Sequence, residues 1–209
     1  GCDNTFIGFS SGLSNDDGFE NTFMGSFAGY SNTSGDCNTF MGHESGFSNT
    51  TGSLNTYVGA RAGRQGNGVQ NAYFGRDAGL VATGNNNTFI GYSSGVSNAG
   101  GGQNTFLGFN SGGSNVSGGY NVAVGFGAGG VHGSSHSIFI GAESYVQPGS
   151  SFSNNSIALG YKAIVSTGSQ FVVGSTFSPI GTSSTVGATY GYLELTLNNV
   201  DVKIPLYNI

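Results

Sequence analysis

The hydrophobic and polar positions of this chain follow one short pattern that returns about every 17 residues. Each copy reads polar, polar, apolar, apolar, glycine, as in Asn87-Thr88-Phe89-Ile90-Gly91. A period this short and this persistent is typical of a solenoid, in which each repeat packs only on its neighbours. The glycines that close the copies, here called the anchor glycines, are Gly8, Gly25, Gly42, Gly59, Gly75, Gly91, Gly108 and Gly125, with weaker copies at Gly141, Gly160 and Gly174.

Two apolar residues precede each anchor glycine and form two columns along the repeats. The first column is Phe6, Phe23, Phe40, Tyr57, Tyr73, Phe89, Phe106 and then Ala123. The second column is Ile7, Met24, Met41, Val58, Phe74, Ile90, Leu107 and Val124. Adjacent residues of a strand point to opposite faces, so the pattern predicts a strand that is buried on both sides. One side faces the interior of the coil, and the other needs a second covering surface.

The energetics of one coil favour association between chains. Ordering the backbone costs roughly 1–2 kcal/mol per residue. The two apolar side chains of a coil contribute only about 1.5–3 kcal/mol each. Symmetric association would bury the second column against partner chains. We therefore expect an oligomer.

The remainder of each coil is rich in residues that form turns. A small residue stands three positions after each anchor glycine, and glycine usually follows it, which suits tight backbone approach and a corner with positive φ. Runs such as Ser31-Asn32-Thr33-Ser34-Gly35 are turn formers by local hydrogen bonding. We interpret the five N-x-[ST] sequons as turn chemistry rather than glycosylation sites; their asparagines are Asn32, Asn49, Asn86, Asn115 and Asn154.

The pattern divides the chain into three segments. Residues 1–133 hold regular coils, residues 134–174 form a transition in which the repeat changes register, and residues 175–209 contain a linker and a C-terminal element. Apolar and polar residues alternate in Tyr192–Leu197 and again from Val200, on either side of Asn198-Asn199. This alternation around two turn residues predicts a β-hairpin. Because the last coil of a solenoid exposes an open strand edge, we expect this hairpin to act as a cap.

Composition narrows the class further. Forty glycines among 209 residues exclude extended helix, because each glycine weakens a helix by roughly 1 kcal/mol. The net charge of −5 leaves no basic patch for nucleic acid. No apolar run approaches the roughly 20 residues that span a bilayer, and no signal-peptide pattern is present. Cys2 and Cys37 are two coils apart, too far for a disulfide, so we expect free thiols.

Candidate chemistry is sparse. The histidines, His43, His132 and His136, lack a third ligand nearby in sequence, so no metal or other cofactor is expected. The carboxylates show no convergence of the kind that glycoside hydrolysis needs, so we do not expect an enzyme. The remaining candidates for recognition are residues at exposed positions that depart from the pattern of small and polar residues. The candidates are the charge cluster Arg61, Arg64, Arg76 and Asp77, and the aromatic residues Tyr30, Phe47, Tyr92 and Phe109.

One stretch resembles a known family. Asn155-Ser-Ile-Ala-Leu-Gly-Tyr-Lys-Ala163 is similar to the head repeat of trimeric autotransporter adhesins, and the longer N-T-F-I-G coils look like a variant of it. The longer coils also resemble repeats of phage tail-fibre and tailspike proteins, and the ending from Gly191 is similar to C-terminal hairpins of phage virion proteins. The resemblance implies a left-handed parallel β-roll in a homotrimer. It also implies contact with host surfaces.

The sequence therefore predicts an all-β, trimeric parallel β-solenoid that forms a fibre or spike on a virion surface. Its expected partners are two further copies, other virion proteins, and a host receptor or glycan. Two other interpretations stay open: a bacterial adhesin head or extracellular filament subunit, and an ice-binding solenoid. The last depends on the regular threonine column, which shares a face with the second apolar column; we expect that face to be buried. The threonines are Thr5, Thr22, Thr39, Thr56, Thr88 and Thr105.

Overall fold

A computed structural model describes residues 1–129, 133–147, 154–175, 178–179, 192–197 and 200–205. It contains two compact units, Gly1–Ser178 and Pro179–Ile209, which are described separately. The first unit is a parallel β-solenoid without helix in its described residues. This confirms the predicted fold class, while trimeric association and the handedness of the coil stay predictions.

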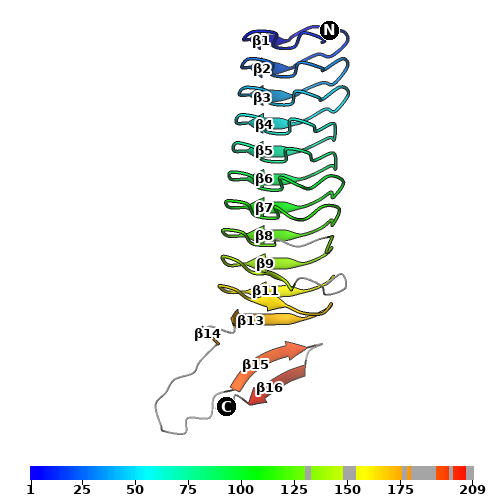
Figure 1. The fold of residues 1–209 in the computed structure, drawn as a ribbon. Helices are drawn as coiled ribbons and strands as arrows, with labels where there is room; N and C mark the ends of the chain where they lie inside the picture. Colours follow the sequence, from blue (N-terminus) through cyan, green and yellow to red (C-terminus); the bar gives the residue numbers. More distant parts are fainter. Residues whose placement is uncertain (130–132, 148–153, 176–177, 180–191, 198–199, 206–209) are drawn as a thin grey trace. The chain divides into compact units, whose positions relative to one another are not determined.

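Each regular coil contributes one short strand to a continuous parallel sheet (Figure 1). The strands coincide with the T-F-I segments before the anchor glycines. They are β1 (Thr5–Ile7), β2 (Thr22–Met24), β3 (Thr39–Met41), β4 (Thr56–Val58), β5 (Ala72–Phe74), β6 (Thr88–Ile90), β7 (Thr105–Leu107), β8 (Val122–Val124), β9 (Ile138–Ile140), β11 (Ile157–Leu159) and β13 (Phe171–Ser175). A second, two-stranded pair is formed by β10 (Tyr145–Val146) and β12 (Ile164–Val165).

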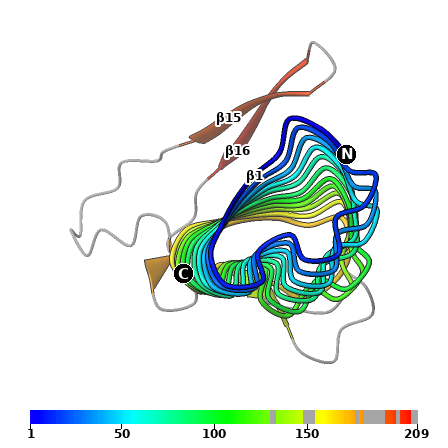
Figure 2. The same ribbon diagram turned by 90° about the horizontal axis from the view of Figure 1, so that it is seen from above.

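The strands pair in perfect register with the repeat. Thr5 pairs with Thr22, Phe6 with Phe23 and Ile7 with Met24, and every later pair follows the same rule. Seen along the stack, successive coils follow the same path, each displaced slightly from the one before (Figure 2). The change from 17-residue to 16-residue steps therefore falls in the turns and leaves the sheet unbroken.

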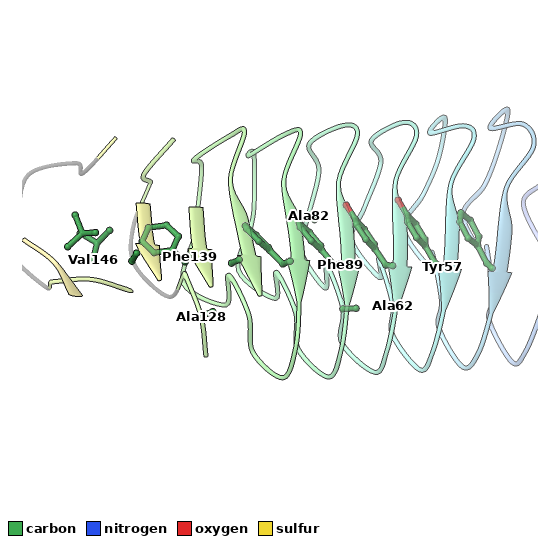
Figure 3. Close-up of a cluster of buried hydrophobic side chains, with 14 of the residues drawn as sticks. Tyr57, Ala62, Ala82, Phe89, Ala128, Phe139 and Val146 are labelled. Carbon is green, nitrogen blue, oxygen red and sulfur yellow. The ribbon is translucent and has the colours of Figure 1, made fainter. Parts of the chain in front are cut away.

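The first apolar column lies inside the coil, and we call it the core column. Phe23, Phe40, Tyr57, Tyr73 and Phe89 are completely buried. Their rings stack one above the next with centroids 4.7–4.9 Å apart, a spacing set by the rung distance of the sheet. Alanines of the same coils surround the stack (Figure 3).

In the first seven coils, a glycine four residues after the anchor glycine makes room for the core ring. Gly95 has a φ of +60°, and a Cβ placed on it would lie 2.5 Å from ring carbons of Phe89. The position thus needs glycine for two reasons, backbone conformation and contact with the ring. This local fit explains why the first apolar column, and not the second, turns inward.

Two coils carry tyrosine in the core column, and each has a smaller residue elsewhere in the coil that leaves space for the tyrosine hydroxyl. Most coils place an asparagine seven residues after the anchor glycine, but the coils of Tyr57 and Tyr73 have Gly66 and Ala82 there. A Cβ on Gly66 would lie 3.1 Å from the hydroxyl oxygen of Tyr57. The tyrosine hydroxyl therefore takes the space of the missing asparagine. Burial raises the pKa of both tyrosines well above its ordinary value, so both stay neutral.

Asparagine side chains hold successive coils together. Asn87, the residue before the T-F-I strand, is completely buried. Its side-chain oxygen accepts a hydrogen bond from the backbone N–H of Asn104 at 2.9 Å, and its amide nitrogen donates to the carbonyl of Gly101 at 2.9 Å. Both partners belong to the next coil. The same pair of bonds recurs from coil to coil at Asn4, Asn21, Asn38, Asn55, Asn71, Asn104 and Asn121.

Three of the five sequon asparagines form a second internal column. Asn32, Asn49 and Asn115 are buried, and each donates to the carbonyl of the glycine three residues later at 2.9 Å. These bonds are the turn chemistry that the sequence predicts. Asn86 and Asn154 are exposed.

Two corners of each coil hold residues other than glycine at positive φ. One corner lies before the buried asparagine, as at Leu54 with a φ of +62°, and the other lies two residues after the anchor glycine, as at Phe27 with +60°. The eighth coil has Gly127 at the second corner, with the same φ. A side chain in this conformation costs roughly 1–2 kcal/mol.

Relief of this strain gives a first prediction. Leu54 is exposed, so Leu54→Gly removes the strain while losing little buried surface. We expect the free energy of unfolding to rise by about 0.5–1 kcal/mol in urea titrations, after subtraction of the extra freedom of glycine in the unfolded chain. Leu13→Gly is the matched control, because Leu13 is an exposed leucine outside the positive-φ residues. It should lose stability, and a gain in both variants would contradict the explanation.

The second unit contains the predicted antiparallel pair. Strand β15 (Tyr192–Leu197) pairs with β16 (Val200–Pro205), and Leu197 lies opposite Val200. The turn residues Asn198 and Asn199 and most of the predicted linker lie outside the described residues. A two-residue strand, β14 (Ser178–Pro179), lies where the first unit ends. The role of the pair as a cap stays a prediction.

Candidate interaction surfaces

The second apolar column lies on the outer side of the parallel sheet. Its exposed members include Ile90 and Leu107, whose side chains are 40% and 44% accessible, while Val58 and Val124 are half-buried. We call this surface the outer sheet face. No position of the face, in strands β1 to β9, β11 or β13, carries a charged residue. Continuous exposed apolar strips are typical of interaction sites on proteins.

The threonine column lies on the same face, as the alternation of the strand predicts. Thr22, Thr39, Thr56 and Thr88 are half-buried, and Thr5 and Thr105 are exposed. In the single chain the face is therefore open. The predicted burial of the threonines depends on a covering partner.

Exposed and half-buried aromatic rings form short stacks along the corners of the solenoid. Tyr92, Phe109 and Phe126 each follow an anchor glycine, and we call these positions the corner column. Their rings stack at 5.2 and 5.1 Å with nearly parallel planes. Tyr30 and Phe47 stack in the same way at 5.0 Å. Because neighbouring rings cover one another, the ring edges rather than the faces are open along most of each stack.

The predicted charge cluster divides into two ion-paired groups. The guanidinium of Arg61 meets the carboxylate of Asp77 at 2.7 Å, and Arg76 lies 3.5 Å from the same carboxylate. Arg64 instead pairs with Glu44 at 2.8 Å and covers the ring of Phe47. The hydrogen bond and charge of Asp77 raise the pKa of Arg61.

These ion pairs also contribute to the register of the coils. Glu44, Arg61 and Asp77 occupy the same corner in three successive coils, so the charges alternate along the stack. Glu143 and Lys162 repeat the arrangement lower in the solenoid, at 3.2 Å. The partly exposed pairs among these contribute little stability each, at most about 1 kcal/mol, whereas the carboxylate of Asp77 is buried. Arg76 is the most open of these cations and also lies 5.8 Å from the ring centre of Tyr92.

The remaining reactive groups are dispersed. His43 packs against the edge of Phe27, His136 stacks on Tyr120, and His132 lies outside the described residues. Among the described residues, no group of three or more His, Cys, Asp or Glu side chains is placed to hold a metal ion. Cys2 and Cys37 are free, as predicted. A hydrogen bond to Glu20 raises the pKa of Cys37 and keeps its thiol protonated.

A search of the described parts of the chain for a helix that could cross a membrane finds none. Comparison with known proteins gives no match to a family model, a curated protein or a solved structure. The function of this chain is therefore inferred from its own surfaces.

Proposed function

We propose that this chain is a segment of a homotrimeric fibre or spike on a virion surface, which holds a recognition surface away from the particle and contacts a host receptor or glycan. The observation that carries the proposal is the uncharged, open outer sheet face. Strands in register at about 4.8 Å per rung extend this face over a length on the order of 50 Å.

The geometry of the outer sheet face favours a second copy of the chain as its cover. A parallel neighbour has the same rung spacing, so its apolar side chains meet those of the first chain at every rung. Closed symmetry lets each chain use the same face, and it avoids the open-ended stacking that leads to filaments of uncontrolled length. The number three rests on the resemblance of residues 155–163 to trimeric adhesin heads.

The mass of the protein tests the proposal. We expect light scattering to give the mass of three chains, and the double substitution Ile90→Lys with Leu107→Lys to give the mass of one. Each lysine would place a charge in the apolar contact, where it is costly to bury. Circular dichroism should show that the strands persist in the single chain.

The matched control places the same two charges elsewhere. Leu54 and Val116 are exposed apolar residues outside the sheet strands, so Leu54→Lys with Val116→Lys should leave the three-chain mass unchanged. A wild-type protein that stays a single chain at every concentration would contradict the proposal. Retention of the trimer by the Ile90 and Leu107 variant would show that another surface joins the chains.

The threonines favour a second candidate function on the same face. Thr5, Thr22, Thr39 and Thr56 lie in register on an open sheet. A flat, regular array of threonine and apolar side chains suits binding to ice. This function needs an uncovered face, so thermal hysteresis by a single-chain protein would favour it over the fibre.

A further inference from the structure

The corner column has one interruption in its lower half. Tyr92, Phe109 and Phe126 form a continuous stack, then Ala142 replaces the ring, and Tyr161 restores it one coil later. The accessible fraction of the side chains rises along the stack from 44% at Tyr92 to 48% at Phe109 and 55% at Phe126. The end of the stack is therefore its most open point. We call the interval between Phe126 and Tyr161 the ring gap.

The backbone keeps its spacing across the ring gap. The N–H of Glu143 donates to the carbonyl of Phe126 at 2.8 Å, and the N–H of Lys162 donates to the carbonyl of Ala142 at 2.9 Å. Phe126 and Tyr161 are thus two rungs apart, on the order of 10 Å. Rings one rung apart in this column lie 5.1–5.2 Å from each other. One six-membered ring at the level of Ala142 would therefore lie at stacking distance from Phe126 and at a similar distance from the level of Tyr161.

The surroundings of the ring gap combine apolar walls with a charged rim. Ala142 forms a small apolar floor, and Phe109 is the ring partner of Phe126 among the described residues, so the opposite face of Phe126 has no aromatic neighbour there. Glu143 and Lys162 meet at 3.2 Å on the next position of the corner, and the Lys162 ammonium lies 5.1 Å from the ring centre of Tyr161.

This chemistry fits a sugar ring better than an all-apolar group. The negative face of an aromatic ring attracts the C–H hydrogens on the apolar side of a pyranose. The hydroxyls around the same pyranose find an acceptor in the carboxylate of Glu143 and a donor in the ammonium of Lys162. A purely aromatic ligand would use the walls but leave this charged rim unused.

We propose that the ring gap binds one pyranose ring of a surface glycan, stacked on Phe126 above Ala142 with its hydroxyls on Glu143 and Lys162. This inference rests on the proposed recognition function and names its ligand class and its place. It also separates the aromatic residues by role. Tyr92 and Phe109 stack on each other and support the stack, while the face of Phe126 opposite Phe109, which has no aromatic neighbour among the described residues, takes the ligand.

The test fills the ring gap with a side chain that the column already uses. Ala142→Phe adds a fourth ring to the stack, on the face of Phe126 opposite Phe109. Saturation-transfer difference NMR on the full chain would use the methyl β-glycosides of glucose, galactose and N-acetylglucosamine at millimolar concentration. We expect transfer to the ring protons of at least one glycoside. We expect Ala142→Phe to weaken this binding by about tenfold or more, because the stacking surface is lost.

Ala60→Phe is the matched control. Ala60 stands at the same position of the corner column, between His43 and Arg76, away from the ring gap. It should leave the transfer unchanged. No transfer from the wild-type protein to any of the three glycosides would overturn the inference, and so would unchanged transfer in Ala142→Phe. Binding of N-acetylphenylalaninamide in the gap without sugar binding would also overturn it, in favour of an aromatic side chain of a partner protein.

The mass measurement separates this inference from the proposed fibre. A three-chain mass without sugar binding would refute the ring gap and leave the fibre in place. Sugar binding by a single chain, lost in Ala142→Phe, would support the ring gap and refute the trimeric fibre.

Discussion

Replacing Phe89 by alanine should lower the free energy of unfolding by about 3–5 kcal/mol, the range of large-to-small substitutions in well-packed cores. Phe89 is completely buried and stacks on Tyr73 at 4.8 Å and on Phe106 at 4.9 Å. The coils above and below cannot close the space that the ring leaves, because sheet and asparagine hydrogen bonds fix their spacing. Denaturant titration followed by circular dichroism would measure the loss.

Phe109→Ala is the matched control for this prediction. Phe109 also stacks between two rings, at 5.2 and 5.1 Å, but it lies on the surface and is about half exposed. Its loss removes stacking but leaves no internal cavity, so we expect only about 1 kcal/mol. Equal losses in the two variants would show that stacking along the column, rather than burial, supplies the stability of the core ring.

The repeat predicted the architecture because its period determines which residues become neighbours. A step of 17 residues places Phe6 beside Phe23 and Thr5 beside Thr22, and the structure pairs them so. Alternation alone separates the two apolar columns but does not say which one faces inward. That choice depends on Gly95 and its equivalents, which lie under the core rings, and such a contact across a turn has no signal in strand periodicity.

The polar part of the coil was harder to interpret. Asparagine next to serine and glycine indicates turns, and Asn32 and Asn49 do form turn hydrogen bonds. Sequence alone did not show that these side chains lie inside the coil, because asparagine is mostly exposed in soluble proteins. A signal was present: the asparagine before each T-F-I strand is as constant as the aromatic residue of the core column.

The candidate recognition residues show where prediction from sequence ends. Arg61, Arg76 and Asp77 do come together, since they stand at neighbouring corner positions of successive coils. Arg64 lies in the same coil as Arg61 but turns to Glu44, one coil earlier. The direction of a long side chain depends on local packing, here on the ring of Phe47, and the repeat does not encode it.

The buried asparagines give the second large prediction. Asn87→Leu keeps the approximate shape of the side chain and removes both of its hydrogen bonds. The N–H of Asn104 would then be buried without a partner, and the carbonyl of Gly101 would keep only the hydrogen bond from the Asn98 side chain at 3.2 Å. The orphaned N–H costs about 1–3 kcal/mol and the lost bond to the carbonyl about 0.5–1.5 kcal/mol, so we expect a loss of about 1.5–4.5 kcal/mol in the free energy of unfolding. The measurement is the same denaturant titration.

The neighbouring residue supplies the control for this substitution. Asn86 is exposed, and equivalent corners of other coils carry glutamine at Gln70 and Gln103, so Asn86→Gln should change stability by less than about 0.5 kcal/mol. Amide hydrogen exchange would locate the effect. Fast exchange at Asn104 in Asn87→Leu, with slow exchange kept at the N–H of Asn38 several coils away, would show that stability in this solenoid is local to adjoining coils. Uniform acceleration along the chain would show instead that the coils unfold as one cooperative unit.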